Sequence, residues 1–146
     1  MDSISGITIA LSLIGLVLLV VLIVALLYKP GKKLYVHAYF IDKGEHVDES
    51  IVEVSVENTG KKQVKMLYPY IRFSHGTHSK IYQLKPTNVE CKFPRILKIG
   101  EKISCKIDLH HYHDPLEKNA FDPTHVRFII KDTVGMIFQS ENLHIK

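Results

Sequence analysis

The chain of 146 residues contains no tryptophan and only two cysteines, Cys91 and Cys105. So little cysteine excludes a disulfide-dense secreted scaffold, in which cross-links replace a large core. The segment 7–28 contains no charged residue, and every charged residue except Asp2 lies after it. This asymmetry excludes an ordinary soluble protein. No second segment approaches the ~20 apolar residues that a membrane crossing requires, which excludes a multi-span transporter.

The uncharged segment 7–28 predicts one transmembrane helix, preceded by a short N-terminal tail, 1–6. A helix of about 21 residues spans roughly 31 Å, close to the thickness of one hydrocarbon core. A cleaved signal peptide is the alternative, but such peptides carry a basic leader and an apolar stretch of only ~7–15 residues. Residues 1–6 contain no Lys or Arg. We therefore expect a permanent anchor in a lipid bilayer.

A basic linker, 29–33, follows the predicted helix and contains Lys29, Lys32 and Lys33. Cytoplasmic flanks of membrane helices are enriched in lysine and arginine, so this flank predicts that the C-terminal domain lies on the cytoplasmic side. The same three lysines are candidates for contact with anionic lipid headgroups at the membrane surface.

Small residues in the first half of the anchor offer places where another helix can approach closely. They are Gly6, Ala10, Ser12 and Gly15, of which Gly6 and Ala10 have the small-xxx-small spacing. A linker of a few residues also keeps the domain close to the bilayer, where a co-resident protein has a high effective concentration. Both features predict another membrane protein as the partner.

Residues 34–146 form the predicted domain, in which apolar and polar residues alternate. Val52, Val54 and Val56 alternate with polar residues, a pattern typical of a half-buried strand. Turn residues separate such segments. Gly60 is expected to supply a positive φ, residues 132–135 a hairpin, and Asp114 the N-cap of one helical turn. Seven strands are expected, at 34–40, 51–58, 64–73, 80–84, 101–109, 124–131 and 136–145, and Pro69 should interrupt the third of them.

These strand and turn patterns resemble those of the immunoglobulin-like and fibronectin type III-like superfamily. The resemblance rests on VEVSVENTGKKQV, on LKIGEKISCKIDL and on the closing segment HVRFIIKDTVGMIFQSENLHI. It implies an all-β fold, a seven-stranded antiparallel immunoglobulin-like sandwich. The core tryptophan and the Cys–Trp–Cys pattern of antibody-type domains are absent. The resemblance implies no particular activity.

All nine histidines lie in the domain, and two groups of them are candidate metal ligands. A zinc or copper site needs three or four converging ligands, and loops at one end of a sandwich can supply them. The spacing matches no familiar metal motif, so we predict no metal and no cofactor, with a zinc- or copper-handling protein as the alternative. The candidate ligands are His75, His78, His110, His111 and His113.

Cys105 shares the inward face of its predicted strand with Ile103 and Ile107. On the cytoplasmic side Cys91 and Cys105 should both be free thiols, whereas an oxidising compartment would allow a disulfide between them. Tyr68 and Tyr70 are candidates for a binding surface, because tyrosine combines apolar area with a hydroxyl group. The alternative is that both rings pack inside the sandwich.

No phosphate-binding loop, nucleophile elbow or dinucleotide fingerprint is present. Residues 34–146 carry a net charge of only +2, from 16 basic and 14 acidic residues, and these charges are interspersed. A nucleic-acid footprint is a concentrated basic face, so we predict no nucleic-acid partner. The sequence identifies no small-molecule substrate. The sequence predicts a non-enzymatic interaction module anchored in a membrane by one helix, such as an accessory subunit of a membrane complex.

Overall fold

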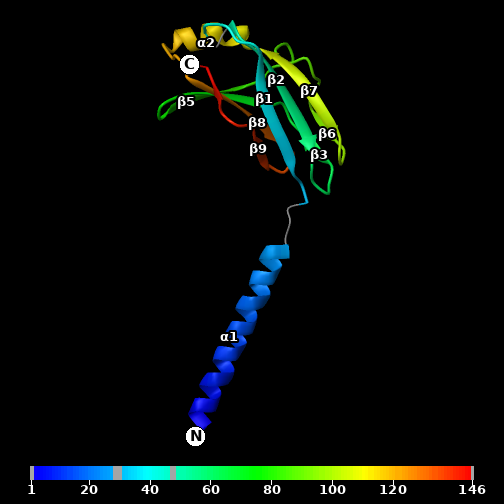
Figure 1. Cartoon of the computed structure of the whole chain (residues 1–146), viewed down its shortest axis with the longest axis vertical. Coiled ribbons are helices and arrows are strands. Elements are labelled where there is room, and N and C mark those ends of the chain that lie inside the picture. The colour runs from blue at the N-terminus through cyan, green and yellow to red at the C-terminus, as the bar shows by residue number, and fades with distance from the viewer. Residues whose placement is uncertain (1, 28–30, 47–48, 146) are drawn as a thin grey trace. The chain divides into compact units, whose positions relative to one another are not determined.

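The computed structural model describes residues 2–27, 31–46 and 49–145. The chain divides into two compact units, residues 1–30 and residues 31–146 (Figure 1). The first unit is one helix and the second is built mainly from antiparallel strands, which we call the β unit. Residues 31–33, predicted as part of the linker, belong to the β unit.

Helix α1 (Asp2–Leu27) contains the predicted anchor. It begins inside the segment that we expected to be a tail, and Tyr28 lies outside the described residues. Its large apolar side chains are exposed on every side, from 44% at Ile23 to 76% at Leu27. The stretch Ser5–Leu27 has a mean hydropathy of 3.3 over its most apolar window, so it is long and apolar enough to cross a membrane. A signal sequence near the N-terminus meets the same criterion.

The strands of the β unit form three antiparallel sheets. The first has the order β1–β2–β7, with β1 (Leu34–Asp42), β2 (Ile51–Asn58) and β7 (Lys102–Asp108). The second has the order β10–β8–β4–β5, with β9 paired to β8; its members are β4 (Tyr70–His75), β5 (His78–Gln83), β8 (His125–Lys131), β9 (Ile137–Gln139) and β10 (Leu143–His144). The third pairs β3 (Val64–Met66) with β6 (Arg95–Leu97).

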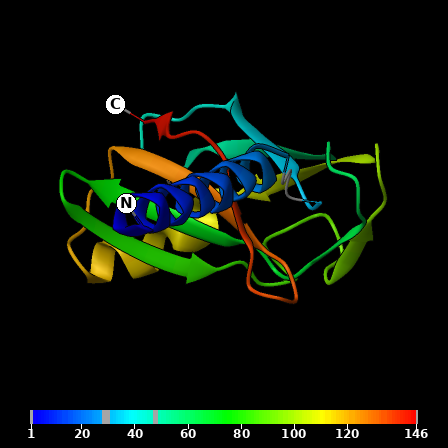
Figure 2. The same cartoon turned by 90° about the horizontal axis from the view of Figure 1, so that it is seen from below.

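The two larger sheets share one hydrophobic core. Figure 1 shows β1, β2 and β7 side by side, and Figure 2 shows the green strands β4 and β5 beside the orange β8. Val52, Val54 and Val56 of β2 are at most 5% exposed, and they belong to the same buried cluster as Phe73 and Phe128 of the other sheet. The alternation in residues 51–58 therefore predicted the buried face correctly, because successive strand residues point to opposite faces.

The described residues contain ten strands where the sequence predicted seven. Pro69 splits the predicted segment 64–73 into β3 and β4, because proline has no N–H to donate to a ladder. The segment 136–145 likewise contains two short strands, β9 and β10. Strand β6 was missed, since three residues are too few to show a period. The predicted all-β, antiparallel class is confirmed, and the seven-strand count is wrong.

Two predicted turn details also differ from the structure. Gly60 has no positive φ; it is needed because a Cβ atom there would lie 2.5 Å from the backbone nitrogen of Lys33. Helix α2 (His113–Lys118) begins one residue before the predicted cap Asp114, and Tyr112 occupies the N-cap. A 3₁₀ helix, η2 (Leu109–Tyr112), precedes α2, and Asp108 caps it with its carboxylate.

Cys91 and Cys105 form a disulfide. Their Cα atoms lie 5.6 Å apart, and the bond attaches the segment between β5 and β6 to strand β7. The expectation of two free thiols is therefore wrong for this fold. Burial of Cys105 on the inner face of β7 was predicted correctly, since its exposed fraction is 4%.

Candidate functional site

The loops of the β unit gather at two opposite ends, which differ in composition. At one end lie residues 31–33 and the loops 59–63, 98–101 and 132–136, which we call the basic end. At the other lie residues 43–46, Glu49, the hairpin turn 76–77 and the segment 109–124, which we call the histidine end. The strand registers separate the two, because β1 and β2 pair from Leu34↔Asn58 at the basic end to Asp42↔Ile51 at the histidine end.

The histidine end is built on η2 and α2. Three apolar side chains, Leu109, Tyr112 and Leu116, are at most 4% exposed and attach both helical segments to the core. The ring of Tyr112 lies 5.4 Å from that of Phe73 and 5.7 Å from that of Tyr82, measured between centroids. Burial raises the pKa of the Tyr112 hydroxyl, despite a hydrogen bond from the Asn88 amide. The exposed side chains of α2 therefore project from a fixed base.

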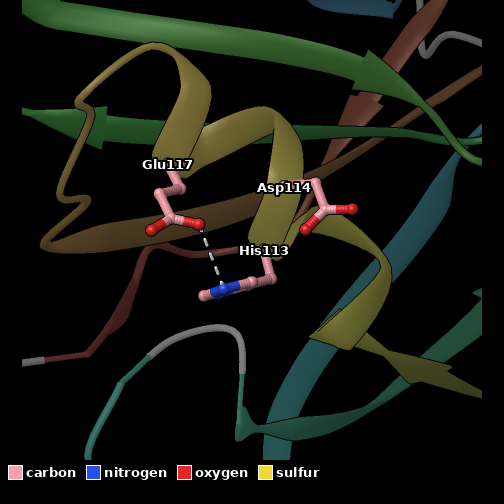
Figure 3. Close-up of side chains that lie close together, drawn as sticks. All are labelled: His113, Asp114 and Glu117. Atoms are coloured by element: carbon pink, nitrogen blue, oxygen red, sulfur yellow. Dashed lines mark ion pairs between the residues drawn. The ribbon is translucent and has the colours of Figure 1, made fainter.

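Three exposed side chains of α2 converge at this end (Figure 3). His113, Asp114 and Glu117 each offer a ligand atom, and these atoms all lie within 4.8 Å of one another. The Nε2 atom of His113 lies 3.3 Å from a Glu117 carboxylate oxygen, an i,i+4 pair on one helix face. Among the residues that the structure describes, this is the one group of three or more His, Cys, Asp or Glu residues with such spacing. An open hollow of about 300 Å³ beside it includes His46 in its lining.

The other predicted histidines do not join this group. The Nδ1 atom of His110 lies 2.7 Å from the Asp108 carboxylate, which also accepts the backbone N–H of His110. That N–H, followed by the His110 ring, lowers the pKa of Asp108 below its ordinary value. His111 is exposed; it lines one hollow with Tyr112 and another with His110, His113 and Asp114, but it is not in the group of three. Of the three histidines at positions 110, 111 and 113, His113 alone therefore belongs to the group with Asp114 and Glu117.

His75 and His78 face each other across the β4–β5 hairpin, as the last residue of β4 and the first of β5. The Nδ1–H of His75 donates to the backbone carbonyl of Asp122 at 2.8 Å, since a carbonyl oxygen can only accept. These two histidines line a separate hollow with Asp122 and Phe121. The structure thus keeps the two predicted histidine clusters apart. Asp114 and Glu117 were missed as candidates because carboxylates on an exposed helix carry no distinctive sequence signal.

The basic end is closed by hydrogen bonds to residues 31–33. The carbonyl of Gly31 accepts the N–H of Lys61 at 2.8 Å, and that of Lys33 accepts the N–H groups of Thr59 and Gly60. The Lys32 ammonium lies 2.9 Å from the carboxylate of Asp132. Of the three lysines predicted to meet lipid, Lys32 is therefore paired within the β unit. Lys33 is exposed, and Lys29 lies outside the described residues.

Asp132 organises the hairpin between β8 and β9. Its side chain is fully buried, and one carboxylate oxygen accepts the N–H groups of Val134 at 3.0 Å and Met136 at 2.8 Å. Burial raises the pKa of Asp132, but the hydrogen bond from Lys32 and the two backbone N–H groups outweigh burial and lower it. The sequence predicted the hairpin at 132–135 but not the ion pair, because Lys32 lies 100 residues away.

Tyr68 and Tyr70, the predicted surface tyrosines, are both partly buried. Tyr68 packs against the core with its ring 5.8 Å from Phe93, and the ammonium of Lys131 lies 4.8 Å from the Tyr70 ring centroid. Within residues 2–27, 31–46 and 49–145, the exposed tyrosines lie instead on the outer face of β1. Tyr35 is 57% exposed and Tyr39 is 43% exposed.

These two tyrosines flank His37 in a row that we call the aromatic ladder. The His37 ring lies 6.3 Å from Tyr35, with nearly parallel planes, and 5.9 Å from Tyr39. The Tyr39 hydroxyl also bonds the Glu53 carboxylate on the neighbouring strand. The alternation in residues 34–40 was the signal that could have identified this face.

The small residues of α1 fall on two faces rather than one. Gly6 and Ala10 are four residues apart and share a face, and Ser12 and Gly15 are three apart and share another. A Cβ atom added at Gly6 or Gly15 would meet no atom within 4 Å outside the helix backbone. The Ser12 hydroxyl donates to the Thr8 carbonyl at 2.9 Å within the helix. The four candidates thus form two short patches for helix packing.

Comparison with known proteins adds no family. No family model matches the chain, and no curated protein sequence matches it. Among solved structures, the chain is similar to the X-ray structure of Northeast Structural Genomics Consortium target SoR45, with 8% identity and a TM-score of 0.34. That match covers 77% of this chain and 84% of the other. A likeness of this size supports no inference about function.

Proposed function

We propose that this chain is a non-enzymatic, single-pass membrane-anchored β-sandwich interaction module, such as an accessory subunit of a membrane protein complex. The observation that carries the proposal is helix α1, whose large apolar side chains are exposed on all sides and which is joined by three residues to a separately packed β unit. A helix that is apolar all round is stable in lipid or inside a larger protein, not in water. Lipid, with other membrane proteins beside it, is the environment that suits it.

The proposed immunoglobulin-like character of the β unit is supported by the allocation of strands to sheets. Constant-type immunoglobulin domains put the first, second, fourth and fifth strands in one sheet, and the third, sixth and seventh in the other. The strand in the fourth place of this unit, β5, departs from that arrangement. Here β1, β2 and β7 correspond to the first set, and β4, β8 and the β9–β10 segment to the second. Strand β5 pairs with β4 in the second sheet.

Two features bear on the side of the membrane, and they point in opposite directions. The lysine flank favours the cytoplasmic side, whereas the Cys91–Cys105 disulfide favours an oxidising compartment. We propose that the β unit lies on the oxidising side of the membrane, because the cytosol keeps disulfides such as Cys91–Cys105 reduced. Three lysines on one flank only bias the direction in which a helix inserts.

Membranes isolated with N-ethylmaleimide present distinguish the two sides. The expected result is an intact chain that carries no maleimide adduct before reduction and two adducts, at Cys91 and Cys105, after it. Protease added to intact cells should also cleave the chain into fragments. Two adducts without prior reduction would return the β unit to the cytoplasmic side. A chain beginning after residue 20 would identify a cleaved signal peptide.

The aromatic ladder is the surface that best suits a protein partner. Tyrosine side chains are enriched at interface hot spots, because they bury a large area at little entropic cost. The ladder lies on an outer face of the β unit, with the polar side chains Glu53 and Glu57 of β2 beside it. Association within the plane of one membrane raises the effective concentration of a partner, so that a small interface suffices.

The test is quantitative co-purification of partners in mild detergent. One variant replaces residues 5–27 with leucines, a second carries Tyr35→Ser, and the matched control carries Tyr70→Ser. Loss of the same partner in the first two variants, with retention in the control, is the expected result. Equal recovery from all three would contradict the proposal.

A metal-handling protein is the second candidate, and the group His113, Asp114 and Glu117 is the observation that favours it. One imidazole and two carboxylates suit zinc, and the fourth tetrahedral position stays open for a transferred ligand. All three side chains are exposed, so such a site would bind an ion weakly and release it readily.

Native mass spectrometry of the full chain in detergent micelles, titrated with zinc or copper, tests this candidate. Stoichiometric binding that is lost in His113→Ala and kept in the control His144→Ala would support metal handling. Binding that is equal in the two variants, or absent from both, would remove the candidate.

A further inference from the structure

The basic end exposes large apolar side chains at the tips of two loops. Val134, in the β8–β9 hairpin, is 71% exposed, and Ile99, in the β6–β7 loop, is 61% exposed. Ile137 and Met136 next to the first tip are 53% and 36% exposed. Single exposed apolar residues are ordinary on protein surfaces. Two loop tips that present them at one end of a small unit call for a specific explanation.

Both tips are held outward by hydrogen bonds within their loops. The buried carboxylate of Asp132 accepts the N–H groups of Val134 and Met136, which fixes the first loop. The Glu101 carboxylate accepts the N–H of Lys98 at 2.9 Å, which fixes the second. Neither tip is therefore free to fold back and cover its own apolar side chain.

Lysines surround these tips, and the acids between them are neutralised. The basic end contains five lysines and two acids, a net charge of +3. Of the two acids, Asp132 is buried and paired with Lys32, and Glu101 lies 3.5 Å from the Arg95 guanidinium. The remaining lysines, Lys33, Lys61, Lys62 and Lys98, are all exposed. Apolar side chains among exposed lysines match the headgroup region of a leaflet that contains anionic phospholipid, where the apolar groups meet acyl chains and the lysines meet phosphates.

The chain length brings a bilayer within reach of this end. Helix α1 ends at Leu27 and the hydrogen-bonded backbone of the β unit begins at Gly31. Four residue steps span at most about 14 Å. The headgroup layer is itself roughly 5–8 Å deep on each side of the hydrocarbon core. If α1 spans a membrane, the short connection keeps the basic end within reach of its surface.

We propose that the basic end of the β unit docks on an anionic phospholipid surface, with Val134 and Ile99 at headgroup level and Lys33, Lys61, Lys62 and Lys98 against lipid phosphates. This inference rests on the membrane anchoring proposed above and adds a second contact to it. The histidine end and the aromatic ladder then remain in the aqueous phase, available to partners.

The absence of tryptophan from the chain permits a direct test. Single tryptophans are introduced as Val134→Trp, Ile99→Trp and Thr77→Trp, the last in the hairpin turn at the histidine end, and as Leu19→Trp in α1. Each full-length variant is reconstituted into nanodiscs of phosphatidylcholine and phosphatidylglycerol that contain lipids brominated near the headgroup or deep in the acyl chain. Retention of the Cys91–Cys105 bond, measured by intact mass, checks the fold.

The expected result is a blue-shifted emission at positions 134 and 99, quenched more strongly by the shallow bromines than by the deep ones. Position 19 should show the reverse order, and position 77 should show neither quenching nor a blue shift. Emission at 134 and 99 that matches position 77, with position 19 quenched, would overturn the inference while leaving the anchor in place. An unquenched tryptophan at position 19 would overturn both.

The charge requirement is tested in the Val134→Trp background. The paired changes Lys61→Glu and Lys62→Glu should reduce quenching at least twofold, as should nanodiscs of phosphatidylcholine alone. The matched control carries Lys80→Glu and Lys118→Glu, far from the basic end, and should leave quenching unchanged. Quenching that is insensitive to both lysine reversal and lipid charge would overturn recognition of an anionic surface.

Discussion

The two ends of the β unit are made from similar numbers of charged residues but hold them differently. The described loops of the histidine end contain five acids and two lysines, a net charge of −3, against +3 at the basic end. At the basic end the carboxylates are buried or paired, so the lysines dominate the surface. At the histidine end the carboxylates of α2 are exposed beside imidazoles. Composition therefore decides the sign of the charge at each end, and at the basic end pairing further reduces the share of carboxylates at the surface.

The largest effect that we expect comes from Asp132, the buried acid of the basic end. Asp132→Ala leaves the Lys32 ammonium and two backbone N–H groups without their acceptor, which should cost about 3 kcal/mol of unfolding free energy. The exposed acid Asp114 is the control, since Asp114→Ala should stay within about 0.5 kcal/mol. Thermal melts of the full chain in detergent measure both. Equal shifts would contradict the difference between the ends.

The pH dependence of this contribution has a defined sign. The pKa of Asp132 is lower in the folded chain than its ordinary value of 3.8, so its stabilisation is present above about pH 4 and is lost as the pH falls through the lowered pKa. Asp132→Asn should therefore reduce the decline in Tm between pH 4 and pH 2. A decline identical to that of the parent chain would show that other carboxylates account for acid unfolding.

A smaller difference is expected between one glycine at each end. Gly60→Ala at the basic end places a Cβ atom 2.5 Å from the Lys33 nitrogen, so the backbone must shift, at a cost of about 2 kcal/mol. Gly76→Ala at the histidine end meets open space but keeps a φ of +57°, at a cost of about 1 kcal/mol. Denaturant unfolding ranks the two. The reverse order would mean that residues 31–33 are not held against the 59–61 turn.

Removal of the cap on η2 should have a local effect. Asp108→Ala deletes the acceptor for the His110 N–H, which should cost about 1 kcal/mol. Hydrogen exchange should accelerate in residues 109–118 and stay unchanged in the 132–136 hairpin. Acceleration spread over both ends would indicate that they unfold as one cooperative unit.

The smallest effect is expected at the exposed pair of His113 and Glu117. Glu117→Gln should change stability by no more than about 0.5 kcal/mol, because exposed i,i+4 pairs contribute little. A thermal melt without added metal measures this. A loss above 1 kcal/mol would assign the pair a structural role.

The sequence predicted local features well and the sites poorly. The valines of β2 repeat with period two, and a one-residue slip would expose all of them, so the strand and its buried face were readable. Strand β6 is three residues long and depends on its pairing with β3, which no local pattern reveals.

Candidate side chains were missed where contacts connect distant parts of the chain. The Lys32–Asp132 pair joins residues 100 positions apart, so Lys32 was interpreted as a lipid contact. The sequence predicted Tyr68 and Tyr70 as surface tyrosines, although among the described residues Tyr35 and Tyr39 on β1 are the exposed ones. Composition predicts which groups are available, and the pairing of strands decides which of them meet.

The hydrogen bonds of residues 31–33 also have a mechanical consequence. A pulling force between the anchor and a partner at the histidine end would act along the axis of β1. The hydrogen bonds between β1 and β2 would then be loaded in shear, and many of them would share the force. Before those hydrogen bonds are stressed, the bonds from Gly31 and Lys33 to the 59–61 turn and the contact between Lys32 and Asp132 must break. Under the anchoring proposed above, these contacts of the first residues of the β unit would break before the strands separate, and so would reduce the tension that reaches the fold.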